Sequence, residues 1–191
     1  MSTANLKDFI FLITNQVISE PLKITNIKIS FLCDKTVELN SDLCINYYKS
    51  YNLIVKHDNF TYTFLGKSKS HLNITGIRSF LDVEAAIVGL TIFSNLELTN
   101  FKYFSVDNIS SVFKTHPGLK EKLLKIKDSD FCIFKPYRFC GIIIKHKKCS
   151  LTYFNSGNVI LVGIKSIPAL NSCVKKYFSF FDYCANLNDV L

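Results

Sequence analysis

The sequence predicts an α+β protein made of two related halves, each with several antiparallel strands followed by one long helix. Three observations favour this class. Two segments recur in the same order along the chain, strand-like runs with alternating polarity lie between them, and each half ends in a run with helical periodicity.

The recurring segments indicate a duplication. LKITNIKIS at 22–30 returns as LELTNFKYF at 96–104, while HLNITGIRS at 71–79 returns as NVILVGIKS at 158–166. No low-complexity linker separates the halves, so we expect them to share one continuous sheet. The predicted organisation is an N-terminal extension at 1–21, a first repeat at 22–95 and a second repeat at 96–191.

Each half carries two further strand-like runs between its anchors. They are NLIVKH and FTYTFLG in the first half, and GIIIKH and CSLTYFNS in the second. With the recurring segments, these runs predict several antiparallel strands in each half. One long helix on each set of strands would leave the other sheet face for a ligand.

The shared Gly-Ile-basic-Ser ending is followed by a change of period from two to about 3.6. In the first half, Ser79 and Asp82 predict a capping box at the helix start. In the second half, Pro168 suits a first helical turn. The expected apolar stripes are Phe80, Val83, Ile87 and Leu90 in the first helix, and Leu170, Cys173, Val174, Tyr177, Phe178 and Phe181 in the second.

The halves differ in length. The second contains an extra stretch from Asn108 to Lys127, for which we expect one or two short helices. The first 20 residues match neither repeat. We expect their apolar run to pack on the body of the protein or on a partner.

Charge and composition restrict the partners without choosing one. The net charge is +8 and the pI is about 9.1, which favours a polyanion such as nucleic acid or an anionic membrane surface. Seven cysteines without framework spacing are typical of reduced thiols inside a cell. The apolar run at 9–13 is too short to span a bilayer, and we expect no membrane anchor.

Signals for catalysis are weak. Gly66-Lys67-Ser68 resembles the end of a phosphate-binding loop, but the required upstream glycine is missing and a strand follows. Cys132, Cys140, His146 and Cys149 lack the spacing of a zinc site. We therefore predict a protein that is not an enzyme and has no metal, cofactor or small-molecule substrate. A basic α+β enzyme with a deep polar pocket stays as the third reading.

One stretch, YRFCGIIIKHKKCSLTYFNSGNVILVGIKS, resembles the signature of the TATA-binding proteins. That signature is a Phe-Pro-Gly strand ending in a basic residue, a Phe-x-Ser-Gly-Lys turn, and a strand ending Thr-Gly-Ala-Lys. The resemblance extends over about residues 22–186 and is looser in the first half. The matching residues are Pro136, Phe139, Gly141 and Lys145, then Phe154, Ser156 and Gly157, and finally Gly163 and Lys165.

The resemblance implies a saddle of two pseudo-symmetric repeats, with one curved antiparallel sheet and helices on the convex face. It also implies that four aromatic wedges, Tyr51, Phe64, Phe139 and Phe154, open base steps at the two ends of a DNA site. The other reading of these four residues is that they belong to the core.

Further roles follow from the same resemblance. The implied base contacts in the minor groove are Asn26, Lys28, Asn73, Thr75, Asn100, Lys102 and Val162. The implied phosphate contacts are Lys56, Arg78, Lys145, Ser156 and Lys165. Each could instead be an ordinary solvated residue. Lys28 and Lys102 stand where the family has small apolar residues, so strict TATA selectivity is not expected.

The partner-binding loop also departs from the family. Lys135, Pro136, Tyr137 and Arg138 form a basic stirrup where the family is acidic. The partners that the resemblance implies are double-stranded DNA, with an AT-rich promoter as the expected site, a TFIIB-like factor or other transcription subunits, and RNA polymerase indirectly. The expected function is minor-groove binding and bending in transcription initiation. The alternative is a protein-interaction scaffold with the same fold and no intercalation. The expected location is the nucleus for a cellular protein, or the virion or cytoplasmic virus factory for a viral one; the composition fits a viral or protist source.

Overall fold

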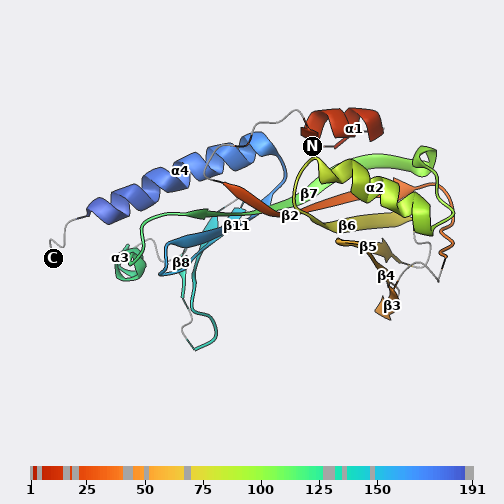
Figure 1. Ribbon diagram of the computed structural model, residues 1–191. Helices are drawn as coiled ribbons and strands as arrows, with labels where there is room; N and C mark the ends of the chain where they lie inside the picture. The colour runs from red at the N-terminus through yellow and green to blue at the C-terminus, as the bar shows by residue number, and fades with distance from the viewer. Residues whose placement is uncertain are drawn as a thin grey trace. The chain divides into compact units, whose positions relative to one another are not determined.

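The computed structural model divides the chain into two compact units, residues 1–17 with 25–108 and residues 18–24 with 109–191. The residues that the structure describes are 2–3, 6–14, 18, 22–40, 45–49, 52–66, 70–126, 132–134, 137–146 and 149–187. Figure 1 shows strands and helices in both units, which confirms the predicted α+β class. The repeat limits at 22–95 and 96–191 stay a prediction.

The first unit holds most strands of the first half and two helices. Its elements are β1 (Ser2–Thr3), α1 (Leu6–Thr14), most of β2 (Lys23–Cys33), β3 (Ile45–Lys49), β4 (Asn52–His57), β5 (Phe60–Leu65), β6 (His71–Ile77), α2 (Asp82–Phe93) and the start of β7 (Phe101–Lys114).

The second unit repeats the succession of strands and long helix. Its elements are the end of β7, α3 (Lys120–Lys125), β8 (Cys132–Ile133), β9 (Ile142–His146), β10 (Cys149–Tyr153), β11 (Asn158–Ile164) and α4 (Ile167–Asn186). Among the described residues the strands follow the order β3-β4-β5-β6-β2-β7-β11-β10-β9-β8, and β1 pairs with β7.

Alternation along the strands separates a covered face from an open one. In β2, Ile27, Ile29 and Phe31 are buried, whereas Lys28 and Ser30 between them are only partly buried. Because successive side chains of a strand point to opposite faces, the apolar set packs beneath the helices and the polar set lies on the open face.

Strand register defines which residues of the two repeats correspond. In the first unit a buried row crosses four strands, and in the second unit a buried row crosses the four corresponding strands. These rows are Leu53–Phe64–Leu72–Phe31 and Ile142–Tyr153–Val159–Phe113. Phe64 therefore corresponds to Tyr153, and Phe31 to Phe113.

These rows correct the alignment of segment 22–30 with 96–104. Counting back from Phe31 and Phe113, Ile27 corresponds to Ile109 and Asn26 to Asn108. Residues 108–114 are thus strand, and α3 is the one helix among the described residues of the extra stretch expected to begin at Asn108. The alignment with 96–104 was wrong because the two segments share only a few identical residues.

Helix α2 covers the first unit and is tied to β5 by a buried hydroxyl. The Tyr62 side chain donates a hydrogen bond to the Ala86 carbonyl at 3.0 Å, and burial raises the pKa of Tyr62. The helix begins at Asp82 after a turn. The expected capping box is wrong, because the Ser79 hydroxyl accepts from the Leu81 amide in that turn instead.

Helix α1 packs on the first unit, as expected for the apolar run of the extension. Phe9 and Ile13 are fully buried, and the Phe9 ring stacks on Phe104 with 5.3 Å between centroids. Phe104 also contacts Phe31 at 5.2 Å. The extension therefore contributes directly to the aromatic core of this unit.

Helix α4 covers the second unit along its length (Figure 1). Ser166 caps its start by accepting from the Ala169 amide at 3.4 Å, with Pro168 in the first turn as predicted. Phe181 is fully buried and lies 5.5 Å from Tyr153. No helix in the described part of the chain is long and apolar enough to cross a membrane.

The Tyr62 hydroxyl gives a stability prediction. Tyr62→Phe removes a buried hydrogen bond and should lower the free energy of unfolding by about 1 kcal/mol, measured by urea denaturation. Tyr183→Phe, at an exposed α4 position, is the matched control and should leave stability unchanged. Equal changes in the free energy of unfolding for the two variants would contradict a stabilising hydrogen bond from Tyr62 to Ala86.

Candidate functional site

Two aromatic side chains meet on the open side of the second unit. The rings of Phe139 and Phe154 lie 5.8 Å apart, edge to face, and Phe139 is 41% exposed. Gly141 makes room for them, because a Cβ there would stand 2.8 Å from the Phe139 ring and 2.6 Å from Thr152. The structure thus brings together two of the four predicted wedges.

The β10–β11 hairpin holds Phe154 in place. Its amide donates to the Asn158 carbonyl, and its carbonyl accepts from the Gly157 amide, both at 2.9 Å. Gly157 has φ +83°, and a Cβ there would overlap the Thr115 carbonyl. This glycine is therefore required both by the turn and by the neighbouring backbone.

The other two predicted wedges are not found on an open face. Phe64 is completely buried, so its assignment as a wedge is wrong. It corresponds to Tyr153, and the residue that corresponds to Phe154 is Leu65. A register one residue off moves every side chain to the other face of a sheet. Tyr51 lies outside the described residues.

Asn26 is held in a defined orientation. Its Oδ1 accepts a 2.7 Å hydrogen bond from the amide of Gly76, a residue with φ +92°. Since only the oxygen of the amide group can accept this bond, the Asn26 NH₂ group is directed elsewhere as a donor.

Asn100 has a different role from the one predicted. It lies in a 3₁₀ turn (Leu98–Asn100), where its Oδ1 accepts from the Glu97 amide at 2.8 Å and its Nδ2 donates to Asp34 at 3.3 Å. It is therefore a structural residue at the start of β7. Asn108 is the counterpart of Asn26 that sequence reasoning missed; the shared pattern Asn-Ile-x-x-x-Phe at 26–31 and 108–113 could have revealed it.

The two predicted groove lysines are both paired with carboxylates. Lys28 lies 3.3 Å from Asp107 on the open face. Lys102 lies 2.6 Å from Asp34, and this hydrogen bond raises the pKa of Lys102 and lowers the pKa of Asp34. Lys102 lies beside the 3₁₀ turn and is not the counterpart of Lys28. By strand register, the residue that corresponds to Lys28 is Ser110.

The remaining predicted groove residues lie on open faces. Asn73 and Thr75 are partly buried on β6, and Val162 is partly buried on β11. Ile160, 36% exposed on β11, belongs to the same face and was missed. It corresponds to Asn73, and alternation with buried Val159 and Leu161 was the signal for it.

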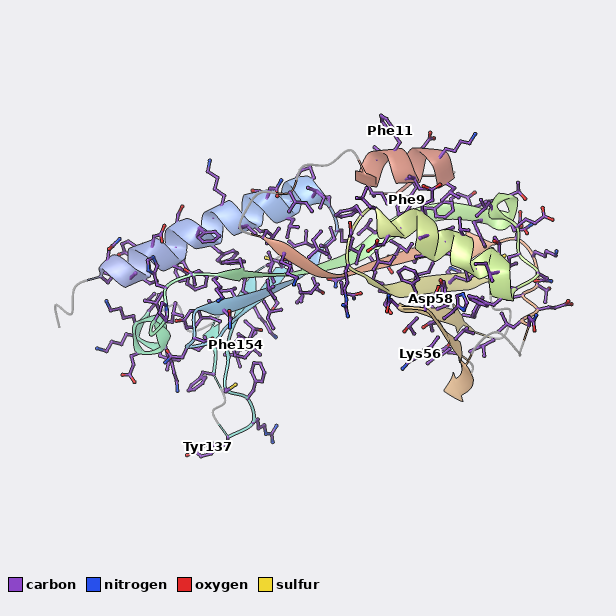
Figure 2. The ribbon with its side chains drawn as sticks, in the orientation of Figure 1. Phe9, Phe11, Lys56, Asp58, Tyr137 and Phe154 are labelled. Atoms are coloured by element: carbon purple, nitrogen blue, oxygen red, sulfur yellow. The ribbon has the colours of Figure 1, made fainter. Side chains whose placement is uncertain are left out.

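The predicted phosphate contacts are exposed. They lie on β4 and β9, in the β10–β11 turn and just after β6 and β11: Lys56, Lys145, Ser156, Arg78 and Lys165. Ser156 accepts a 3.1 Å hydrogen bond from Asn158 Nδ2. Figure 2 shows Lys56 on the side of β4 that points away from α2.

The basic stirrup is partly described. Tyr137 and Arg138 are exposed, and Figure 2 shows Tyr137 at the tip of a loop that extends from the second unit. Lys135 and Pro136 lie outside the described residues. A fully exposed tyrosine beside an arginine suits a contact with another macromolecule.

The described residues give little support for catalysis. No group of three His, Cys, Asp or Glu side chains among them could hold a metal ion. One pocket of about 270 Å³ is lined by Lys23, Val112, Phe113, Lys114 and Asn158, which include no acid, histidine or cysteine. Cys149 lies 3.7 Å from Cys173, and burial raises the pKa of Cys149 to about 11, which disfavours a reactive thiolate.

The fold is that of an α+β protein, and the described residues predicted to bind a partner lie on its open sheet faces and in its loops. The family model of transcription factor TFIID, or TATA-binding protein (TBP), matches residues 103–183. The chain also resembles the solved structure of Methanococcus jannaschii TBP, with a TM-score of 0.65 and 16% identity over 85% of this chain and 98% of that one. The likeness to this structure confirms the predicted TBP-like fold. No curated protein sequence matched.

Gly157 gives a test of the hairpin that positions Phe154. Gly157→Ala should destabilise the protein by more than Gly118→Ala, because both positions have positive φ but only Gly157 lacks space for a Cβ. We expect each change to cost about 1–2 kcal/mol from backbone strain, with an added penalty at Gly157. Urea denaturation of the two variants measures this difference, and equal stabilities would disprove the close approach of Thr115.

Proposed function

We propose that this protein binds double-stranded DNA through the minor groove and bends it during transcription initiation. The observation that carries the proposal is the Phe139–Phe154 pair, two neighbouring aromatic rings on the open side of the second unit. Aromatic side chains that enter the minor groove unstack a base step and kink the duplex toward the major groove. The matched family is one of DNA-binding transcription factors, which supports the same role.

The open face of the second unit suits the floor of a minor groove. Ile160 and Val162 present apolar surface there, and Thr152 lies beside Ile160 in the register. Adenine and thymine offer no amino donor in the minor groove, whereas guanine adds an N2 amino group that apolar side chains cannot pair. An A·T-rich site is therefore the favoured partner of this unit.

Asn26 supplies a directional donor. Since Gly76 fixes its oxygen, its NH₂ group has a set direction from which it would donate to adenine N3 or thymine O2. Its counterpart Asn108 lies on the corresponding strand of the second repeat. A central pair of amide donors would read A·T pairs without contacting the ends of the site.

Exposed cations supply the charge that a DNA-binding surface requires. Lys145 lies on β9, and Lys165 follows β11 in the same unit. The net charge of +8 adds a long-range attraction to a polyanion. We assign Lys56, Arg78, Lys145, Ser156 and Lys165 to phosphates that flank the groove.

The proposal includes a second macromolecule at the stirrup. Tyr137 and Arg138 are exposed, and the positive charge of Arg138 favours an acidic surface. A TFIIB-like factor or another transcription subunit would join RNA polymerase through this contact. The site of action would be the nucleus for a cellular protein and the virion or cytoplasmic factory for a viral one.

A protein-interaction scaffold without intercalation is the second candidate. The complete burial of Phe64 and the Asp107 carboxylate on the open face of the first unit favour it. Both features weaken the DNA surface of that unit. Bending and binding measured separately discriminate between the two candidates.

Removing the aromatic pair tests the bending. Phe139→Ala with Phe154→Ala should abolish most shortening of an end-labelled A·T-rich duplex in FRET, because no ring is left to unstack a step. Fluorescence anisotropy on the same samples measures binding. Tyr183→Ala, an exposed aromatic on α4, is the control and should bend DNA like the wild type. Binding without bending by the wild type would support charge-driven attachment, and no binding would support the scaffold.

Salt dependence tests the phosphate contacts. Lys145→Ala should reduce the slope of log K against log salt by about 1, because one fewer phosphate is neutralised. Lys175→Ala, which removes an exposed lysine of α4, should leave the slope unchanged. Equal slopes for the wild type and both variants would remove Lys145 from the interface.

A further inference from the structure

The two repeats differ at the positions that would open a base step. Tyr153 corresponds to Phe64 in the buried rows, so the next residue, Phe154, corresponds to Leu65. Phe139 stands three residues before Ile142, and the residue three before Leu53 is a serine, Ser50, outside the described residues. The first repeat therefore has Leu65 where the second has Phe154, and a serine in the sequence position of Phe139.

The difference continues across the open faces. One row crosses four strands in each repeat, and the corresponding rows can be compared residue by residue. They are Ile143–Thr152–Ile160–Val112 in the second repeat and Ile54–Thr63–Asn73–Ser30 in the first. Two apolar residues of the second repeat are thus replaced by an amide and a hydroxyl in the first.

The polar row of the first repeat joins a hydrogen-bonded group on the same face. Ser30 Oγ donates to Asp107 Oδ1 at 2.8 Å and lies 2.8 Å from Ser105 Oγ. Lys28 neutralises the carboxylate from 3.3 Å. In the second repeat, Val112 takes the position of Ser30.

Opening a base step needs apolar surface at the point of insertion. Unstacking costs a few kcal/mol per step, and the inserted side chain must replace the lost stacking contacts. The rings of Phe139 and Phe154 offer such surface in the same unit whose open face carries Ile160 and Val112. Polar side chains already bound to one another cannot offer it, because inserting them would also break their own hydrogen bonds.

We propose that the protein kinks its duplex at one base step only, beneath the Phe139–Phe154 pair, while the first repeat holds an unkinked duplex by polar contacts. This inference rests on the proposed DNA binding and specifies its geometry. It follows that the complex is directional, since one end of the site is opened and the other is not. A site that is easily unstacked is required at one end alone.

Matched truncations in the two repeats test the inference. Phe154→Ala should remove most of the bend measured by FRET, whereas Leu65→Ala at the corresponding position should leave it unchanged. The wild-type bend should be roughly half the ~80° that is the reference value for TBP itself. Leu65→Phe should increase the bend, because it places an aromatic side chain at the second end.

Fluorescence anisotropy on the same samples measures DNA binding separately from bending, so it distinguishes the single-kink inference from the proposed DNA binding. Thermal melting shows that each variant is folded. Absence of binding by folded wild type overturns both proposals. If the wild type binds and bends, equal losses with Leu65→Ala and Phe154→Ala would show kinks at both ends and overturn the single-kink inference alone. A bend that survives Phe154→Ala would also overturn it.

Discussion

The two-residue period of the strands is the constraint on which the rest of the structure depends. Each unit covers one sheet face with a helix, so the residues between the buried ones form the open face. Tyr153 and Phe154 illustrate the consequence, because the first is buried against Phe181 and the second meets Phe139 on the open side. Neighbouring residues in the sequence thus have unrelated roles.

Backbone contacts fix the side chains that the open face presents. Gly157 closes the hairpin behind Phe154, and Gly141 leaves space for the Phe139 ring. Gly76 fixes the amide of Asn26 through its own N–H. Orientation set before binding reduces the entropy lost on association, so these contacts would favour the proposed recognition without touching the ligand.

The sequence was sufficient to predict the architecture because apolar periodicity and duplication report burial directly. Pro168 and the helical stripes followed from local patterns, whereas Phe139 and Phe154 were implied by the family resemblance. Register was harder to predict, since one residue decides the face and an inserted residue leaves the pattern intact. Phe64 was misplaced for that reason. The Asp107 contacts with Lys28 and Ser30 join residues more than seventy positions apart, which no local pattern encodes.

The open face of the first repeat carries charged and polar side chains, whereas the open face of the second repeat is more apolar. A carboxylate on a face that meets DNA repels phosphates and the acceptor atoms of A·T pairs, but Asp107 is neutralised by Lys28 and bound by Ser30. A guanine N2 amino group would find an acceptor there, whereas the apolar face around Ile160 has none to offer. In the proposed complex, charge and hydrogen bonding in the first repeat would therefore tolerate G·C pairs that the second repeat would disfavour. The first repeat thus lacks the aromatic stacking surface of the second and has polar contacts instead. The two halves of one duplicated fold would therefore recognise the two ends of a DNA site differently, one by polar contacts and the other by aromatic insertion.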